Sequence, residues 1–76
     1  MIGDVAVDIH GNIYSSEGTD ALVKRNATGQ VMALWHNFSA VGSLAVNAQG
    51  IIYGTDQNGN QVFKISPTGK VLAVWK

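Results

Sequence analysis

The feature that most constrains this chain is an internal repeat with a period of about 40 residues, a length typical of stacked repeat units. The two copies align with twelve identical positions, six before a single-position gap and six after it. The identities include Gly3 with Gly42, Tyr14 with Tyr53, Thr28-Gly29 with Thr68-Gly69, and Trp35 with Trp75. A tandem repeat of this kind indicates two similar supersecondary units that bury their apolar faces by stacking on each other.

Each copy is predicted to contain four short β-strands. The candidate segments are rich in Val, Ile, Tyr, Phe and Trp and are bounded by Gly, Asn, Asp and Pro, which is typical of strands joined by tight turns. The predicted strands cover residues 4–8, 12–16, 21–25 and 30–35 in the first copy and 43–47, 51–55, 61–65 and 70–75 in the second. No segment free of turn residues has a 3.6-residue apolar period, so no helix is expected.

The last predicted strand of each copy is apolar on both faces. An antiparallel sheet with one face in water alternates apolar and polar residues, but residues 31–35 and 71–75 are continuous apolar runs. A four-stranded antiparallel unit of about 40 residues that needs cover on both faces is a blade of a β-propeller. The predicted fold class is therefore all-β, with two four-stranded antiparallel propeller blades.

The sequence also resembles the NHL-repeat propeller family. The resemblance lies in residues 3–8, 11–14, 23–24, 29–31 and 35 of the first copy and in residues 44–47, 50–53, 56, 60, 62–64, 66–71 and 75 of the second. It implies blades that usually close as a ring of six, with a role in binding or in scaffolding an active site. The chain would be one two-blade unit over residues 1–76, with blade boundaries at about 2–40 and 41–76. One departure is that Ala21 and Gln61 stand where the family usually has Arg.

Composition excludes several classes of function. Five acidic residues balance five basic ones, so we expect no net field that would attract nucleic acid or an anionic membrane. The chain has no cysteine, which excludes disulfides and thiolate metal sites. Its longest apolar runs are about five residues, far below the ~20 needed for a transmembrane helix. No signal peptide is visible, and the cellular location is left open with the cytoplasm as the default.

Two blades are too few to close a propeller, since natural rings have about four to eight. The apolar faces left open would cost on the order of 10 kcal/mol of burial per chain. We therefore expect head-to-tail self-association, with three chains favoured and two or four as alternatives. The rival interpretation is a fragment of a larger NHL-type propeller; a chain running from the first strand to the last favours the oligomer. The residues expected to serve packing and assembly are Tyr14, Trp35, Tyr53, Phe63 and Trp75.

Polar residues in the loops form a candidate ligand face. By the family resemblance, the loops after each second strand and between blades share one face, which could take a protein or a small polar ligand. Its candidate residues are Glu17, Asp20, His36, Asn37, Asp56, Asn58 and Asn60. Their oxygens would suit a weak cation or polyol site. The simpler interpretation, which we favour, is that such residues build turns through their own hydrogen bonds.

Asp4 and Ser43 open the innermost strands and are candidates for the central channel. The chain has no nucleophile elbow, no phosphate-binding glycine loop and no His spacing suited to zinc. We therefore expect a non-catalytic scaffold or binding module with no cofactor and no metal. The alternative is a piece of a metal-assisted hydrolase or lyase that uses rim and channel residues.

Overall fold

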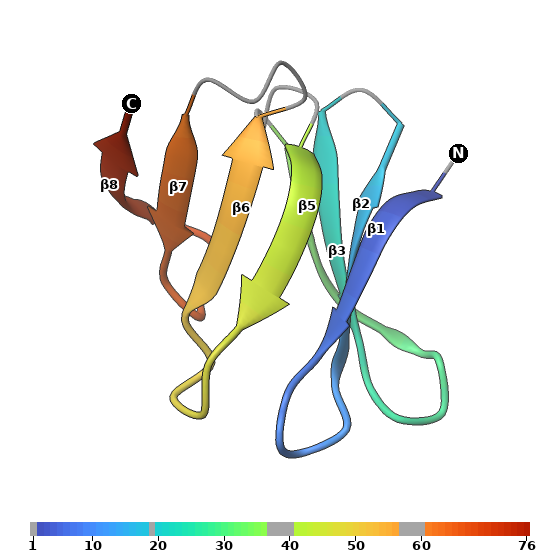
Figure 1. The fold of residues 1–76 in the computed structure, drawn as a ribbon. Helices are drawn as coiled ribbons and strands as arrows, with labels where there is room; N and C mark the ends of the chain where they lie inside the picture. The colour runs from blue at the N-terminus through green and yellow to red at the C-terminus, as the bar shows by residue number, and fades with distance from the viewer. Residues whose placement is uncertain (1, 19, 37–40, 57–60) are drawn as a thin grey trace.

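The strands of the chain pair into two separate four-stranded antiparallel sheets (Figure 1). The structure is a computed structural model that describes residues 2–18, 20–36, 41–56 and 61–76. Blade 1 has the order β1-β2-β3-β4 and blade 2 the order β5-β6-β7-β8. The strands are β1 Ile2–Val7, β2 Ile13–Glu17, β3 Ala21–Arg25, β4 Val31–Trp35, β5 Val41–Val46, β6 Ile52–Asp56, β7 Val62–Ile65 and β8 Val71–Trp75. The predicted all-β class with two four-stranded blades is confirmed.

Four hairpin turns share one geometry and lie at the same end of the two blades (Figure 1). In each, the fourth residue is a glycine with φ between 80° and 90°, a region that other residues adopt only with strain. The side chain of the first residue accepts hydrogen bonds from the backbone N–H groups two and four positions later. The four first residues are Asp8, Asn26, Asn47 and Ser66. This local chemistry fixes hairpin register.

Several predicted strand ends were wrong by one or two residues. Asp8 and Asn47 belong to the turns, because their backbone N–H groups close the turn on Asn12 and Ile51 instead of continuing the sheet. In the opposite direction, Glu17 extends β2, since it pairs with residues of both β1 and β3.

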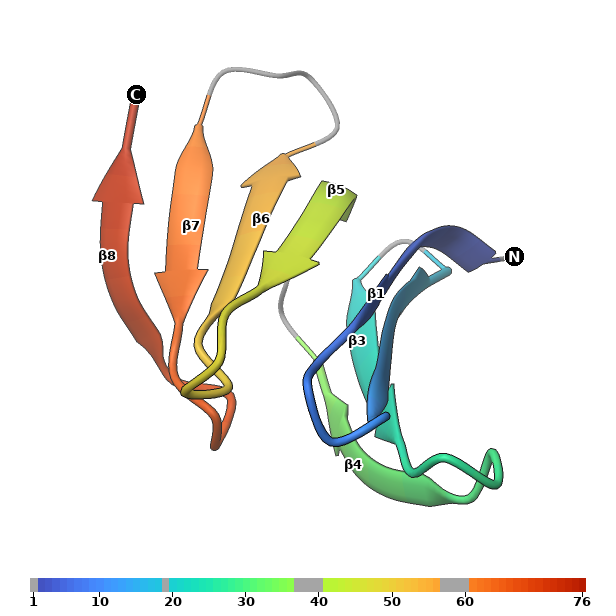
Figure 2. The same cartoon turned by 60° about the horizontal axis from the view of Figure 1, so that its bottom comes forward.

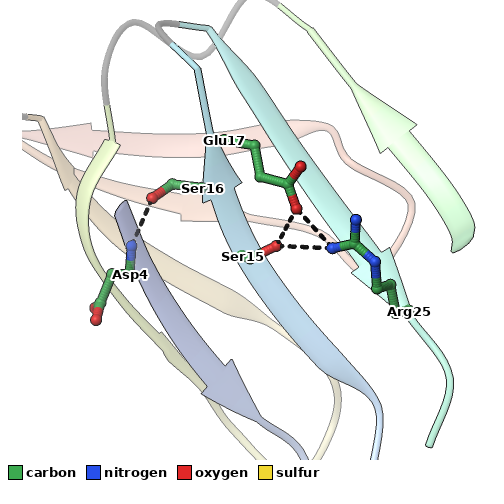
Figure 3. Close-up of polar contacts among 5 residues, drawn as sticks. All are labelled: Asp4, Ser15, Ser16, Glu17 and Arg25. Carbon is green, nitrogen blue, oxygen red and sulfur yellow. Dashed lines mark hydrogen bonds and ion pairs between the residues drawn. The ribbon is translucent and has the colours of Figure 1, made fainter. Parts of the chain in front are cut away.

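The inner strands β1 and β5 each begin with a β-bulge. The register shifts between Ile2 and Val5 in β1 and between Val41 and Leu44 in β5. A hydroxyl on the neighbouring strand accepts the N–H that the bulge leaves unpaired: Asp4 N donates to Ser16 Oγ at 2.9 Å, and Ser43 N donates to Thr55 Oγ1 at 3.1 Å. A bulge bends its strand and re-aims the side chain, here that of Asp4 (Figure 3).

The hydrophobic core lies between the two blades, and we call this interface the closed seam. It is built around five buried side chains, with four partly buried ones packed against them. The buried ones are Tyr14, Leu22, Val41, Ile52 and Ile65, and the others are Trp35, Leu44, Val46 and Phe63. Strands β1 and β5 lie next to each other in this interface, and β8 lies at the outer edge of blade 2 (Figure 2). Val23, buried at 4% exposure on the other face of blade 1, is the one buried apolar side chain of the described residues outside this cluster, so most of the core belongs to the contact between blades, as expected for a stacked repeat.

Among the described residues there is no helix of the length and apolar character that a membrane span requires.

Candidate functional site

Each blade has one face in the closed seam and one face against which no other described strand packs. On the latter face of blade 1, Ser15 and Val23 are nevertheless buried, at 2% and 4% exposure. Side chains alternate between the faces of a strand, and directly paired residues share a face, so the strand register assigns every position. The open face of blade 1 carries Val5, Val7, Ile13, Ser15, Glu17, Val23, Arg25 and Leu34. The open face of blade 2 carries Ala45, Tyr53, Thr55, Val62, Lys64, Ala73 and Trp75.

Apolar side chains dominate the exposed parts of both open faces. Val5 and Val7 are 51% and 58% exposed on blade 1, and Trp75 is 50% exposed on blade 2. A hollow of about 190 Å³ on blade 2 is lined by residues of β5, β6 and β7, among them Ser43, Tyr53 and Val62. Exposed apolar clusters of this kind are typical of surfaces that bind another protein.

The two open faces are the repeat counterparts of the two halves of the closed seam. On the blade 1 side of the seam, Tyr14, Leu22 and Trp35 correspond to Tyr53, Val62 and Trp75 on the open face of blade 2. The matching set on the blade 2 side is Leu44, Val46, Ile52, Phe63 and Ile65, which correspond to Val5, Val7, Ile13, Val23 and Arg25 on the open face of blade 1. The molecule therefore exposes both halves of an interface that it has already built once.

A polar cluster occupies the centre of the blade 1 open face (Figure 3). Arg25 Nη1 donates to Glu17 Oε2 at 2.6 Å and to Ser15 Oγ at 3.2 Å, and Ser15 Oγ donates to Glu17 Oε2 at 2.8 Å. The hydrogen bond from Arg25, followed by that from Ser15, lowers the pKa of Glu17. The Glu17 carboxylate is thus held in place by its own blade and does not project as a rim ligand.

A second polar cluster lies beneath the β1–β2 turn and was not identified from the sequence. The carboxylate of Asp8, buried at 9% exposure, accepts hydrogen bonds from the backbone N–H groups of His10 and Asn12, from Asn12 Nδ2 and from the Tyr14 hydroxyl. Burial by itself would raise the pKa of Asp8, but these hydrogen bonds, led by those from Asn12, outweigh it and lower the pKa to about 2.

The Tyr14 ring connects this cluster to the closed seam. Burial, followed by the hydrogen bond to Asp8 and the Asp8 charge, raises the pKa of Tyr14 to about 12. Lys24 Nζ lies 5.6 Å from the centre of the Tyr14 ring, within the range of a cation–π contact. The Asp8–Tyr14 pair therefore stabilises the fold and has no exposed group to offer a substrate.

The structure brings together only some residues of the candidate ligand face, which forms the rim at one end of the blades. His36 Nδ1 lies 3.8 Å from Asp20 Oδ2, with both side chains more than half exposed. Glu17 and Asp56 end strands β2 and β6, so their assignment to the following loops was wrong; both are held in strand pairs, with Ala21 and with Val41. Asn37, Asn58 and Asn60 lie outside the described residues. Within the described part of the chain, no three acidic or His side chains gather closely enough to hold a metal ion.

The channel candidate Asp4 connects the two blades. Leu44 N donates to Asp4 Oδ2 at 2.7 Å, so the carboxylate binds the innermost strand of the other blade. Its counterpart Ser43 is exposed and lines the hollow on blade 2. Of the packing candidates, Tyr14, Trp35 and Phe63 lie in the closed seam, whereas Tyr53 and Trp75 lie on the open face of blade 2.

The two clusters that were missed differ in how visible they are in the sequence. Asp8 heads the pattern Asp/Asn/Ser-x-x-Gly, which occurs at all four hairpin turns, so that spacing could have identified it. The Glu17–Arg25 pair has no such signal, because Arg25 is eight residues away and aligns with Ile65.

Comparison with known proteins supports the fold and does not assign a family. No protein-family model matches the sequence, and no curated protein matches it. Among solved structures, a streptogramin B lyase, which is a β-propeller, superimposes with a TM-score of 0.75 at 16% sequence identity over 97% of this chain. The chain spans 26% of the length of that lyase chain. A likeness at this level of identity shows the fold alone, and the two sheets are blades of the β-propeller kind.

Proposed function

We propose that this chain is a non-catalytic two-blade propeller unit that assembles head to tail into a closed ring and serves as a scaffold or binding module. The observation that carries the proposal is the correspondence between the open faces and the closed seam. The open face of blade 2 resembles the blade 1 half of the closed seam, and the open face of blade 1 resembles the blade 2 half. Two complementary faces on opposite sides of one chain favour head-to-tail addition of further copies.

The number of copies follows from the number of blades. Three chains of two blades would give six, the ring size implied by the resemblance to NHL-repeat propellers. Two or four chains would give four or eight blades, which remain within the natural range of about four to eight. Burying Val5, Val7 and Trp75 against another copy would supply apolar burial that two blades alone lack.

A ring of copies would also repeat the rim residues by symmetry. The Asp20–His36 pair would recur once per chain at the end of the blades opposite the four hairpin turns. We propose this rim as the place where a protein or a small polar ligand would bind, since it is exposed and carries both a carboxylate and an imidazole.

The second candidate function is a piece of a propeller enzyme of the metal-assisted hydrolase or lyase kind. Likeness in fold to a streptogramin B lyase favours considering it. Against it, the carboxylates of Asp4, Asp8 and Glu17 are engaged by backbone, turn and Arg25 contacts that hold the fold. An enzyme of this kind predicts a stoichiometric divalent ion that is lost on Asp4→Asn, which elemental analysis of the purified chain would detect.

Light scattering of the purified chain tests the assembly. A solution mass of three times the 8.0 kDa of one chain would support the ring of three copies. A mass of two or four times that of one chain would support a ring of two or four copies. A folded species that stays at 8.0 kDa at all concentrations would contradict the proposal. Circular dichroism on the same sample establishes that the species is folded.

A further inference from the structure

At the outer end of the closed seam, an indole lies directly on a glycine. Trp35 ends β4 of blade 1, and a Cβ added to Gly69 in the β7–β8 turn of blade 2 would overlap the Trp35 ring. The counterparts of these two residues are Trp75 and Gly29. Trp75 is half exposed, and a Cβ at Gly29 would meet nothing within 4 Å. The chain thus exposes the Trp75 indole on the open face of blade 2 and leaves space at Gly29, in the β3–β4 turn of blade 1, where an indole could pack.

At the inner end of the closed seam, a side chain of β1 binds the backbone of β5. Asp4 Oδ2 accepts the hydrogen bond from Leu44 N at 2.7 Å. In the repeat, Ser43 corresponds to Asp4, and Val5 corresponds to Leu44. Both pairs lie at the β-bulges of the inner strands β1 and β5. Ser43 has a shorter, uncharged side chain, so the same position carries a weaker acceptor.

Between these ends, the closed seam is filled by the inner strand of blade 2. Leu44 and Val46 of β5 pack against the cluster that contains Tyr14 and Leu22. On the open face of blade 2, the corresponding place is the hollow lined by Tyr53 and Val62. The counterparts of Leu44 and Val46 are Val5 and Val7, both more than half exposed at the opposite end of the molecule.

We infer that the open face of blade 2 binds a second copy of this chain in the register of the closed seam. Trp75 of one copy then lies on Gly29 of the next, Val5 and Val7 of the next copy fill the hollow, and Ser43 faces the Val5 N–H. The inference rests on the proposed head-to-tail assembly and adds the contacts that define it. A second copy is the occupant because three separate features on one open face have their partners on the other.

The sharpest test is a gain of affinity at Ser43. Ser43→Asp places a carboxylate where the closed seam has Asp4, so the dissociation constant between copies is expected to fall about tenfold, because a hydrogen bond to a charged group is the stronger kind. Trp75→Ala is expected to raise that constant about a hundredfold, because a large aromatic side chain that packs on its partner is among the residues that contribute most to binding. Both side chains are exposed within one chain, so neither change removes a core contact. Sedimentation equilibrium measures both constants.

Cross-linking supplies an independent readout, since the chain has no cysteine of its own. Ser43→Cys combined with Val5→Cys is expected to form disulfides between copies, seen as multiples of 8.0 kDa on a non-reducing gel. The matched pair Asp4→Cys and Leu44→Cys is expected to cross-link within one chain and to run at 8.0 kDa.

The outcomes separate this inference from the proposed function. A wild-type ring whose dissociation constant is unchanged by Ser43→Asp and Trp75→Ala would overturn the register and leave the assembly standing. A folded wild-type monomer would overturn both. Tighter binding by Ser43→Asp, weaker binding by Trp75→Ala, and cross-links between copies together support the seam as described.

Discussion

Blade 1 and blade 2 have the same strand order and the same turns, yet they differ at the positions that face a seam. In the closed seam, the repeat has the larger apolar residue at Leu22, the more strongly binding residue at Asp4 and the apolar residue at Ile65. At the counterpart positions on the open faces stand Val62, Ser43 and Arg25, in that order.

The difference shows how one repeat can serve two environments. On the face in the closed seam, a larger apolar side chain and a hydrogen-bonded carboxylate both stabilise the fold, because their contacts are made in every folded molecule. The open face of each blade is exposed to water within one chain and carries a polar or smaller group among its apolar residues, which limits the exposed apolar surface. The following experiments test whether this division holds.

The largest difference is expected between Leu22→Ala and Val62→Ala, which remove counterpart side chains. Leu22 is completely buried, so its truncation should lower the free energy of unfolding by about 2–5 kcal/mol at any protein concentration. Val62 is 39% exposed within one chain, and the loss on Val62→Ala should appear only at concentrations where copies associate. Urea unfolding over a series of protein concentrations distinguishes the two. Equal, concentration-independent losses would contradict the division of faces.

Asp8 and Asn47 head equivalent turns, and only Asp8 carries a charge. Because the pKa of Asp8 is lowered to about 2 in the folded chain, its carboxylate stabilises the fold above pH 4 and loses this contribution as the pH falls toward 2. The lowered pKa of Asp8 corresponds to about 2 kcal/mol of stability at neutral pH. Asp8→Asn, which copies the blade 2 residue, should remove that part of the acid sensitivity. Unfolding free energies measured at pH 7, 4 and 2.5 check this; an unchanged acid profile would show that Asp8 is not responsible.

The tyrosines Tyr14 and Tyr53 provide a smaller contrast. Tyr14→Phe removes the hydrogen bond to the Asp8 carboxylate and should cost about 1–2 kcal/mol. Since the pKa of Tyr14 is raised to about 12, the wild-type chain should lose stability as the pH rises above 10, and Tyr14→Phe should lessen that loss. Tyr53→Phe is the matched control, because Tyr53 lies on the open face. Thermal unfolding at neutral and alkaline pH would show whether the two variants differ.

The smallest effect on stability is expected at Arg25. Arg25→Ile installs the blade 2 residue, and since the Glu17–Arg25 pair is about a quarter exposed, the free energy of unfolding should change by less than about 1 kcal/mol. The pKa of Glu17 should rise, because the hydrogen bond from Arg25 is the main cause of its lowering. A carboxyl NMR titration of the variant measures this, and a Glu17 pKa that stays low would assign the lowering to Ser15 instead.

Much of the fold followed from local patterns. Tyr14, Trp35 and Phe63, expected from the sequence to serve packing and assembly, lie in the closed seam, because large apolar side chains in strands tend to be buried. The strand ends were less well predicted, since Asp8 and Glu17 are compatible with both a strand and a turn until their hydrogen bonds are known. The candidate site was only partly foreseen. The sequence placed Trp75 and Tyr53 in the same packing and assembly group as Trp35 and Tyr14. It did not show that only the latter two lie in the closed seam.

The sequence by itself determined the repeat, the eight strands and the four glycine turns, because these depend on contacts within a few residues and on the backbone freedom of glycine. Only the tertiary structure decided which face of each blade is covered. Neighbouring residues of a strand lie on opposite faces, so a change of register by one residue exchanges the two faces. The Asp4–Leu44 contact and the Glu17–Arg25 pair depend on that choice, which is made by packing one blade against the other.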